Sequence, residues 1–151
     1  MEIEFGQFLF EVVQGRILFH KFGAFKSARG NIFSEIQVCG ENKDTHLGVK
    51  MVNSSEGNRL EYVSHKQRED ALEIIQRSPF IEVKTTFISY MDTSSVRIYT
   101  EIKNISSREI VLEEVSAFVM PSVGDNSIEN SKNLQFYRFL QSHHAECQPR
   151  K

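Results

Sequence analysis

Alternation of apolar and polar residues with a period of two is the feature that most constrains how this chain can fold. It is clearest at residues 95–103, where Val96, Ile98, Thr100 and Ile102 alternate with charged residues and Tyr99. Because successive side chains of a strand point to opposite faces, this pattern predicts a β-strand with one buried face. A polar turn at 104–108 and a β-rich run at 109–120 follow, so we expect an antiparallel hairpin.

Other segments are also candidate strands, and they are separated mostly by Gly, Asn, Asp or Ser. We expect residues 80–90 to precede the hairpin as the first strand of a meander. Residues 69–77 allow a helix, with Asp70 and Glu73 as a capping box, but their apolar residues favour a strand slightly. The remaining predicted strands are Phe8–Val13, Arg16–Phe22, 32–38, 47–52, 59–64 and 134–141. This spacing predicts an all-β domain, a sandwich rather than an α/β fold.

Length and charge exclude several classes of function. With 151 residues the chain is long enough for one domain, not two. A formal net charge of -2 predicts no binding to nucleic acid or to an anionic membrane. Residues 1–10 include Glu2 and Glu4 and have no basic start, so they predict neither a signal peptide nor a transmembrane helix. We therefore expect a cytoplasmic protein.

The densest group of metal-ligand residue types is His143 and His144 with Glu146 and Cys147. Neighbouring histidines in a strand point to opposite faces, which argues against joint coordination of a metal. We expect no metal and no cofactor, and interpret the group as a loop that lends polar side chains to a neighbouring site. Cys147 and Cys39 are expected to be free thiols in a reducing compartment.

The motifs do not predict catalysis by this chain. His20, His46 and His65 lie in no recognised nucleophile motif, and no Gly-rich phosphate loop is present. Glu113 and Glu114 are interpreted as a solvated strand edge, because a glycosidase pair must face one sugar cleft. The chain has 12 Phe and no Trp, and the Phe residues in strand-like runs are expected in the core, namely Phe8, Phe10, Phe33, Phe80 and Phe118. If a sugar is stacked, the candidates are exposed tyrosines, namely Tyr62, Tyr99 and Tyr137.

A series of short motifs runs along the chain from Leu60 onward. The motifs are LEYVSH from Leu60, LEIIQR from Leu72, VRIYTEIKN from Val96, VLEEVSAF from Val111 and ECQPR from Glu146. In this order they resemble the N-terminal domain of α-galactosidases of glycoside hydrolase family 36, which are melibiase-like enzymes.

The resemblance implies an antiparallel two-sheet β-supersandwich, galactose mutarotase-like, packed on a catalytic (β/α)8 barrel. In the family the nucleophile and the acid/base are aspartates of that barrel, which works by the retaining mechanism. Since a barrel needs roughly 250 residues, we expect residues 1–151 to be a single N-terminal β-sandwich domain that lacks the barrel. No catalytic residue is then expected here.

The role implied by the resemblance is indirect. The domain would pack on the barrel of the same polypeptide, contribute to a homo-oligomer interface and lend a loop to the pocket for terminal α-galactosides. The family commonly has a Trp in the segment resembling residues 142–146, whereas this sequence has no Trp. His143 stands near that position, so His143 and His144 are the candidate substrate-binding residues.

The alternative is a free-standing carbohydrate-binding or protein-interaction β-sandwich, which needs only the strand pattern. Exposed apolar surface separates the two hypotheses. An accessory domain without its barrel should expose an apolar patch larger than the few hundred Å² that is normal for monomers, and an autonomous module should not.

Overall fold

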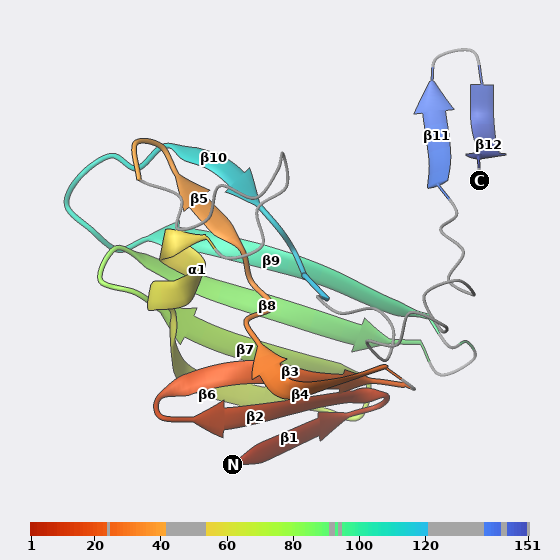
Figure 1. The fold of residues 1–151 in the computed structure, drawn as a ribbon, viewed down its shortest axis with the longest axis horizontal. Helices are drawn as coiled ribbons and strands as arrows, with labels where there is room; N and C mark the ends of the chain where they lie inside the picture. The colour runs from red at the N-terminus through yellow and green to blue at the C-terminus, as the bar shows by residue number, and fades with distance from the viewer. Residues whose placement is uncertain are drawn as a thin grey trace. The chain divides into compact units, whose positions relative to one another are not determined.

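The structure, a computed structural model, describes residues 1–23, 25–41, 54–90, 93, 95–120, 138–142 and 145–150. The chain forms two compact units, Met1–Pro121 and Ser122–Lys151. Antiparallel strands make up most of the described residues, together with one short helix, α1 (Ser55–Arg59) (Figure 1). The predicted all-β class is therefore confirmed.

The first sheet of the larger unit is an antiparallel meander. Its strands, in order, are β1 (Glu2–Phe5), β2 (Phe8–Val13), β3 (Arg16–Phe22) and β4 (Phe25–Asn31). Gln14 and Gly15 connect β2 to β3 with positive φ angles of 50° and 77°, as a two-residue type I′ turn requires. The bounds of β2 and β3 match the predicted strands, whereas the prediction lacked β1 and β4.

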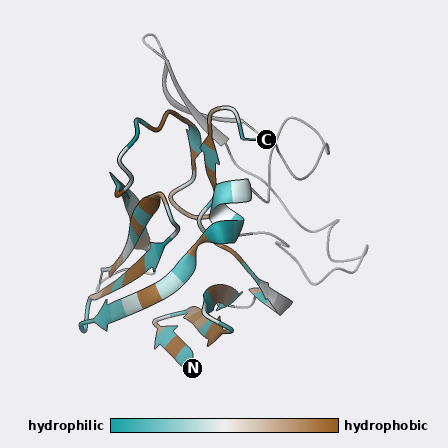
Figure 2. Cartoon of the chain, turned by 90° about the vertical axis from the view of Figure 1, so that its left-hand side faces the viewer, coloured by the Kyte–Doolittle hydropathy of each residue, from teal (hydrophilic) through white to brown (hydrophobic). Residues whose placement is uncertain are grey.

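The second sheet is also a four-stranded antiparallel meander. Its strands, in order, are β6 (Glu61–Gln67), β7 (Ala71–Arg77), β8 (Ile81–Ser89) and β9 (Val96–Asn104). Residues 69–77 therefore contain a strand and not a helix. Strands β8 and β9 pair without a register shift from Ile81↔Asn104 to Ser89↔Val96, which confirms them as neighbours. Hydrophilic and hydrophobic residues alternate along the strands (Figure 2).

The predicted hairpin between β9 and the run at 109–120 is wrong. Within that run the strand is β10 (Leu112–Val115), and it pairs with β5 (Ile36–Val38). After β9, the Asn104 side chain accepts from Ser106 N at 2.9 Å and donates to Arg108 O at 2.7 Å. This closed turn leads the chain away from the edge of β9. The pairing beyond β10 continues where Ser116 N donates to Glu35 O at 2.9 Å.

Two further predicted strands differ from the structure. In the segment 32–38, only residues 36–38 form a strand, and in the segment 59–64 the strand begins at Glu61, after α1 and its C-cap residue Leu60. The predicted strand at 47–52 lies outside the described residues.

The two meanders pack on each other through a core rich in phenylalanine. Its buried side chains are Ile3, Phe5, Phe8, Phe10, Ile17, Phe19, Phe33, Leu72, Ile74 and Phe87. Phe118, from the segment after β10, also joins this core, with its ring centroid 5.2 Å from that of Phe19. A smaller cluster, formed by Ile36, Leu60, Ile81 and Val83, joins β5 to the other end of the second sheet.

A row of buried or partly buried hydroxyl and amide groups lies beside these apolar residues, where the segment before β5 contacts the second sheet. The row, here called the polar seam, consists of Ser34, Gln76, Thr85 and Thr100. Ser34 Oγ lies 3.4 Å from both Gln76 Oε1 and Thr85 Oγ1, and the two threonine hydroxyls are 3.3 Å apart. Thr100 Oγ1 also donates to Ala117 O at 3.0 Å. Buried polar groups of this kind are tolerated because they satisfy one another.

The smaller unit contains an antiparallel hairpin of β11 (Arg138–Ser142) and β12 (Ala145–Arg150). The predicted strand at 134–141 is confirmed for residues 138–141, and its first four residues lie outside the described ranges. Among the described residues of both units, no helix is long and apolar enough to cross a membrane.

Candidate functional site

Helix α1 is attached to β5 by its N-cap. Ser54 Oγ accepts from Gly57 N at 3.2 Å and from Ile36 N at 2.9 Å, while Ser54 N donates to Glu35 Oε2 at 2.6 Å. A Cβ at residue 57 would lie 2.6 Å from Ser34 O, so only glycine permits this close approach. Capping and close packing together hold the short helix against β5.

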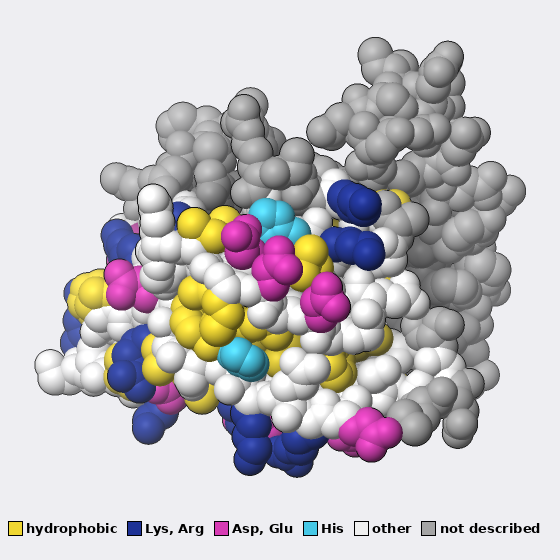
Figure 3. All heavy atoms as spheres, turned by 90° about the horizontal axis from the view of Figure 1, so that it is seen from below, with side chains coloured by type: hydrophobic (Ala, Val, Ile, Leu, Met, Phe, Trp, Pro, Cys, Tyr) yellow, Lys and Arg dark blue, Asp and Glu magenta, His cyan; other side chains and the backbone are white. Residues whose placement is uncertain are grey.

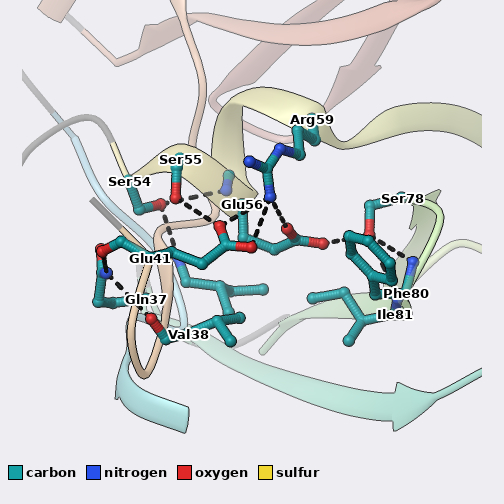
Figure 4. Close-up of polar contacts among 12 residues, drawn as sticks. Gln37, Val38, Glu41, Ser54, Ser55, Glu56, Arg59, Ser78, Phe80 and Ile81 are labelled. Atoms are coloured by element: carbon teal, nitrogen blue, oxygen red, sulfur yellow. Dashed lines mark hydrogen bonds and ion pairs between the residues drawn. The ribbon is translucent and has the colours of Figure 1, made fainter. Parts of the chain in front are cut away.

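A network of charged side chains centred on Arg59 lies next to this attachment (Figure 4). Arg59 Nη1 lies 2.8 and 2.7 Å from the two carboxylate oxygens of Glu41 and 3.1 Å from Glu56 Oε2. Ser55 Oγ donates to Glu41 Oε2 at 2.8 Å, and the Ser78 hydroxyl donates to Glu56 Oε1. These contacts join the 39–41 turn, α1 and the turn between β7 and β8.

Within the network, Glu41 and Arg59 stabilise each other's charged forms. Burial acts to raise the pKa of Glu41, but hydrogen bonds from Arg59 and Ser55, with the charge of Arg59, lower the pKa overall. The hydrogen bond to Glu41 raises the pKa of Arg59, against the effect of burial. Because these groups bind one another, we assign the network a structural role: it holds the turn after β5 against α1.

Gln37 extends this arrangement into β5. Its side chain is 1% exposed, and Nε2 donates to Val38 O at 3.1 Å and to Glu41 O at 2.9 Å. These bonds close the turn that follows the strand. Gln37 Oε1 has no hydrogen-bond partner among the described residues.

A surface hollow of about 440 Å³ lies at the end of the β5–β10 pair. It is lined by Val38, Cys39, Gly40, Glu41, Arg108, Glu109, Ile110 and Val111. The Cys39 thiol is free and exposed, and the guanidinium of Arg108 lies 4.5 Å from the centroid of the Phe80 ring.

Strand β10 borders the hollow and is exposed along its whole length. Val111, just before it, is 56% exposed, and within it Leu112 and Val115 are 37% and 43% exposed. The two residues between them, Glu113 and Glu114, are exposed as well. We call the hollow and residues 111–115 together the β10 surface.

A second hollow, of about 400 Å³, lies at the edge of the second sheet. It is lined by Arg59, Glu61, Tyr62, Val63, Arg77, Ser78 and Pro79. The Tyr62 hydroxyl lies 2.7 Å from His65 Nδ1, and burial raises the pKa of the Tyr62 phenol. Tyr62 also packs against the main core, so part of its side chain is buried and unavailable to the hollow.

The three tyrosine candidates do not form a common sugar platform within the described residues. Tyr99 is 36% exposed, with the Arg97 guanidinium 5.7 Å from its ring centroid. It lies on the outer face of the second sheet, whereas Tyr62 faces the core between the sheets. The third candidate, Tyr137, lies outside the described residues.

The surface in Figure 3 shows acidic, histidine and hydrophobic side chains close together on the lower side of the molecule. On the first sheet, His20 Nε2 lies 3.1 Å from Glu11 Oε2, and Glu2 is the cross-strand partner of Glu11. No group of three or more His, Cys, Asp or Glu side chains that could hold a metal ion occurs among the described residues.

The sequence-predicted substrate-binding residues, His143 and His144, lie outside the described residues. Glu146 and Cys147 are placed only as members of β12. Sequence reasoning missed the network around α1, although its helix signals are present: Ser54 as N-cap, Glu56 in the first turn and Arg59 in the last.

Comparison with protein-family models, with curated proteins and with solved structures found no match for this chain.

Proposed function

We propose that this chain is a non-catalytic domain that packs against a second folded unit, as the N-terminal β-supersandwich domain of an α-galactosidase does. The proposed second unit is the catalytic barrel of the same polypeptide, which hydrolyses terminal α-galactosides. The motif series between Leu60 and Arg150 and the confirmed all-β class support this proposal.

The observation that carries the proposal is the exposure of the β10 surface. Val111 is more than half exposed, and Leu112 and Val115 are more than one third exposed. Single exposed apolar residues are ordinary, but three of them within the five residues 111–115 beside a hollow are typical of a contact surface. Burying them against a second unit would remove apolar area from water at about 25 cal/mol per Å².

Hydrogen bonds and an ion pair fix the turn that lines the β10 surface. Gln37 and Glu41 hold the turn after β5, and Arg59 binds Glu41 to α1. A preformed surface loses little conformational entropy when it is covered, so more of the burial energy stabilises the contact. The domain would thus act by positioning its partner and shielding one side of it, and would affect the galactoside substrate only indirectly.

A free-standing carbohydrate-binding or protein-interaction domain is the second candidate, and the second hollow favours it. There, the guanidinium groups of Arg59 and Arg77 are oriented by ion pairs with Glu56 and Glu82, next to Tyr62. Oriented Arg donors beside an aromatic edge can bind sugar hydroxyls.

The experiment compares α-galactosidase activity on a chromogenic α-galactoside for this chain and for a product extended through the downstream reading frame. Activity only in the extended product supports the accessory domain. Activity in this chain contradicts it, and activity in neither favours the free-standing domain.

In the extended product, Val111→Ser with Val115→Ser tests the β10 surface directly. We expect this double variant to lose activity on heating at a lower temperature than the parent. Val13→Ser with Val63→Ser is the matched control, because both residues are exposed valines outside β10. Equal losses in the two double variants would remove β10 from the proposed contact.

A further inference from the structure

We propose that the free edge of β10 accepts an extended segment of another polypeptide as an added antiparallel strand, with basic side chains opposite Glu113 and Glu114. The inference rests on the proposed function, since it concerns the same β10 surface, and it specifies the chemistry of the partner segment.

Among the described residues, the backbone of β10 is paired along one edge. In the part of the chain that the structure describes, β10 has β5 as its sole strand neighbour. Cys39 N donates to Val111 O at 2.8 Å and Ser116 N donates to Glu35 O at 2.9 Å, so the β5 edge is held at both ends of the strand. An edge with unpaired N–H and C=O groups is a template for strand addition.

The side chains define which segment fits. Apolar side chains in the partner would pack on the exposed apolar residues Val111, Leu112 and Val115. Basic side chains would pair with the exposed carboxylates of Glu113 and Glu114. Glu109, also exposed, adds to the acidic character, while Arg108 is directed to the ring of Phe80. Complementary charge across an added strand favours the correct partner and its register.

Two features of β10 work against indiscriminate pairing. The register shifts between Leu112 and Glu114, and such bulges interrupt a strand edge. The two adjacent carboxylates also repel an acidic or identical strand. A second copy of this chain is therefore disfavoured, because antiparallel pairing of β10 with itself would place the Glu113–Glu114 pair of one copy against that of the other.

The test uses a fluorescein-labelled peptide with two adjacent lysines flanked by valines as the probe and measures its binding to the whole chain by fluorescence anisotropy. The same peptide with glutamates in place of the lysines is the charge control. A valine–lysine peptide methylated on alternate backbone nitrogens keeps its side chains and charge but has lost the hydrogen bonds of one edge. We expect the methylated peptide to bind at least about tenfold more weakly.

Two chain variants locate the site. Glu113→Lys with Glu114→Lys should weaken binding of the valine–lysine peptide by about tenfold or more. Glu69→Lys with Asp70→Lys makes the same charge change at an exposed turn between β6 and β7, and should leave binding within about twofold of the parent. Amide hydrogen exchange in residues 111–115 should slow when the peptide is bound.

Equal binding of the methylated peptide, or equal losses in the two charge variants, would overturn strand addition. Concentration-dependent dimerisation that is lost in the Glu113→Lys, Glu114→Lys variant would overturn it as well, by identifying a second copy as the occupant. If strand addition fails while the β10 valine variant still destabilises the extended product, the proposed function stands and only this mode of contact is wrong.

Discussion

Arg59 Nη1 lies 3.1 Å from Glu56 Oε2, and this pair joins a side chain that is 44% exposed to one that is completely buried. The carboxylate of Glu56 is therefore removed from water, and the Arg59 guanidinium and the Ser78 hydroxyl bind it. A buried charge with partners is stable, whereas the same charge without its cation is costly. Several consequences of this and of neighbouring contacts can be measured.

Replacement of Arg59 by Ala should lower the free energy of unfolding by about 2 kcal/mol, because the Glu56 carboxylate loses its cation while it stays buried. The measurement is urea unfolding at neutral pH. Arg68→Ala is the control, since Arg68 is 56% exposed and pairs with the partly exposed Glu73, and it should cost less than about 1 kcal/mol. Similar losses for both variants would show that the network does not stabilise the fold.

Acid should remove the contribution of Glu41 to stability. The pKa of Glu41 is lowered from the ordinary 4.5, since hydrogen bonds from Arg59 and Ser55 outweigh burial. A carboxylate with a depressed folded-state pKa stabilises the fold fully above its unfolded-state pKa, and the stabilisation is lost as the pH falls through the folded-state value. We expect the difference in unfolding free energy between the parent and Glu41→Gln to be constant near neutral pH and to shrink below pH 4.5. A difference that grows in acid would contradict this sign.

Two neighbouring threonines of β8 should respond oppositely to replacement by valine. Thr85 belongs to the polar seam, so Thr85→Val should destabilise the protein by about 1 kcal/mol through lost hydrogen bonds. Thr86 Oγ1 is buried and has no hydrogen-bond partner among the described residues. Thr86→Val should therefore be neutral or stabilise by up to about 1 kcal/mol. Thermal unfolding of the two variants decides the order, and the reverse order would refute the assignment of the seam.

Replacing Gly30 or Gly15 by alanine tests whether the backbone at residue 30 lies too close to its neighbours to admit a Cβ, with residue 15 as the matched control. Both have positive φ, of 70° and 77°, so alanine is strained at either position. A Cβ at residue 30 would lie 2.7 Å from His20 Nε2 and 2.9 Å from Leu18 Cβ, whereas a Cβ at residue 15 meets nothing within 4 Å. We expect Gly15→Ala to cost about 1 kcal/mol and Gly30→Ala about 2 kcal/mol or more.

The His20→Ala variant tests whether the imidazole ring causes the extra cost of Gly30→Ala. If the clash involves the imidazole ring, combining His20→Ala with Gly30→Ala should cost less than the sum of the two single changes. Chemical denaturation of the single and double variants measures this coupling. Strict additivity would locate the cost of Gly30→Ala elsewhere.

Local sequence was sufficient where a strand and its turn are close in the chain. The bounds of β2 and β3 were predictable because residues 8–13 and 16–22 are rich in aromatic and branched apolar residues and the intervening Gln14-Gly15 suits a type I′ turn. Residues 71–77 were also assigned correctly as a strand, although their capping residues allowed a helix. The prediction lacked β1, although exposed Glu2 and Glu4 alternate with buried Ile3 and Phe5, because this signal extends over only four residues, the shortest run that indicates a strand.

The candidate site was much less accessible from sequence. The predicted residues His143 and His144 lie outside the described residues and stay a prediction. The interpretation of Glu113 and Glu114 as a solvated strand edge is confirmed, since both are exposed on β10, but the pairing of β10 with β5 could not be read from its LEEV sequence. The network around α1 joins Glu41 to Arg59 and Glu56 to Ser78, pairs separated by many residues.

The sequence by itself determined that this chain forms antiparallel strands with a phenylalanine core, because alternation and turn chemistry act between residues that are close in the chain. Only the tertiary structure decided that β10 pairs with β5 instead of β9, and that Glu56 is buried beside Arg59. Such contacts depend on which surfaces are left to cover once the two sheets have packed, and no local pattern encodes that.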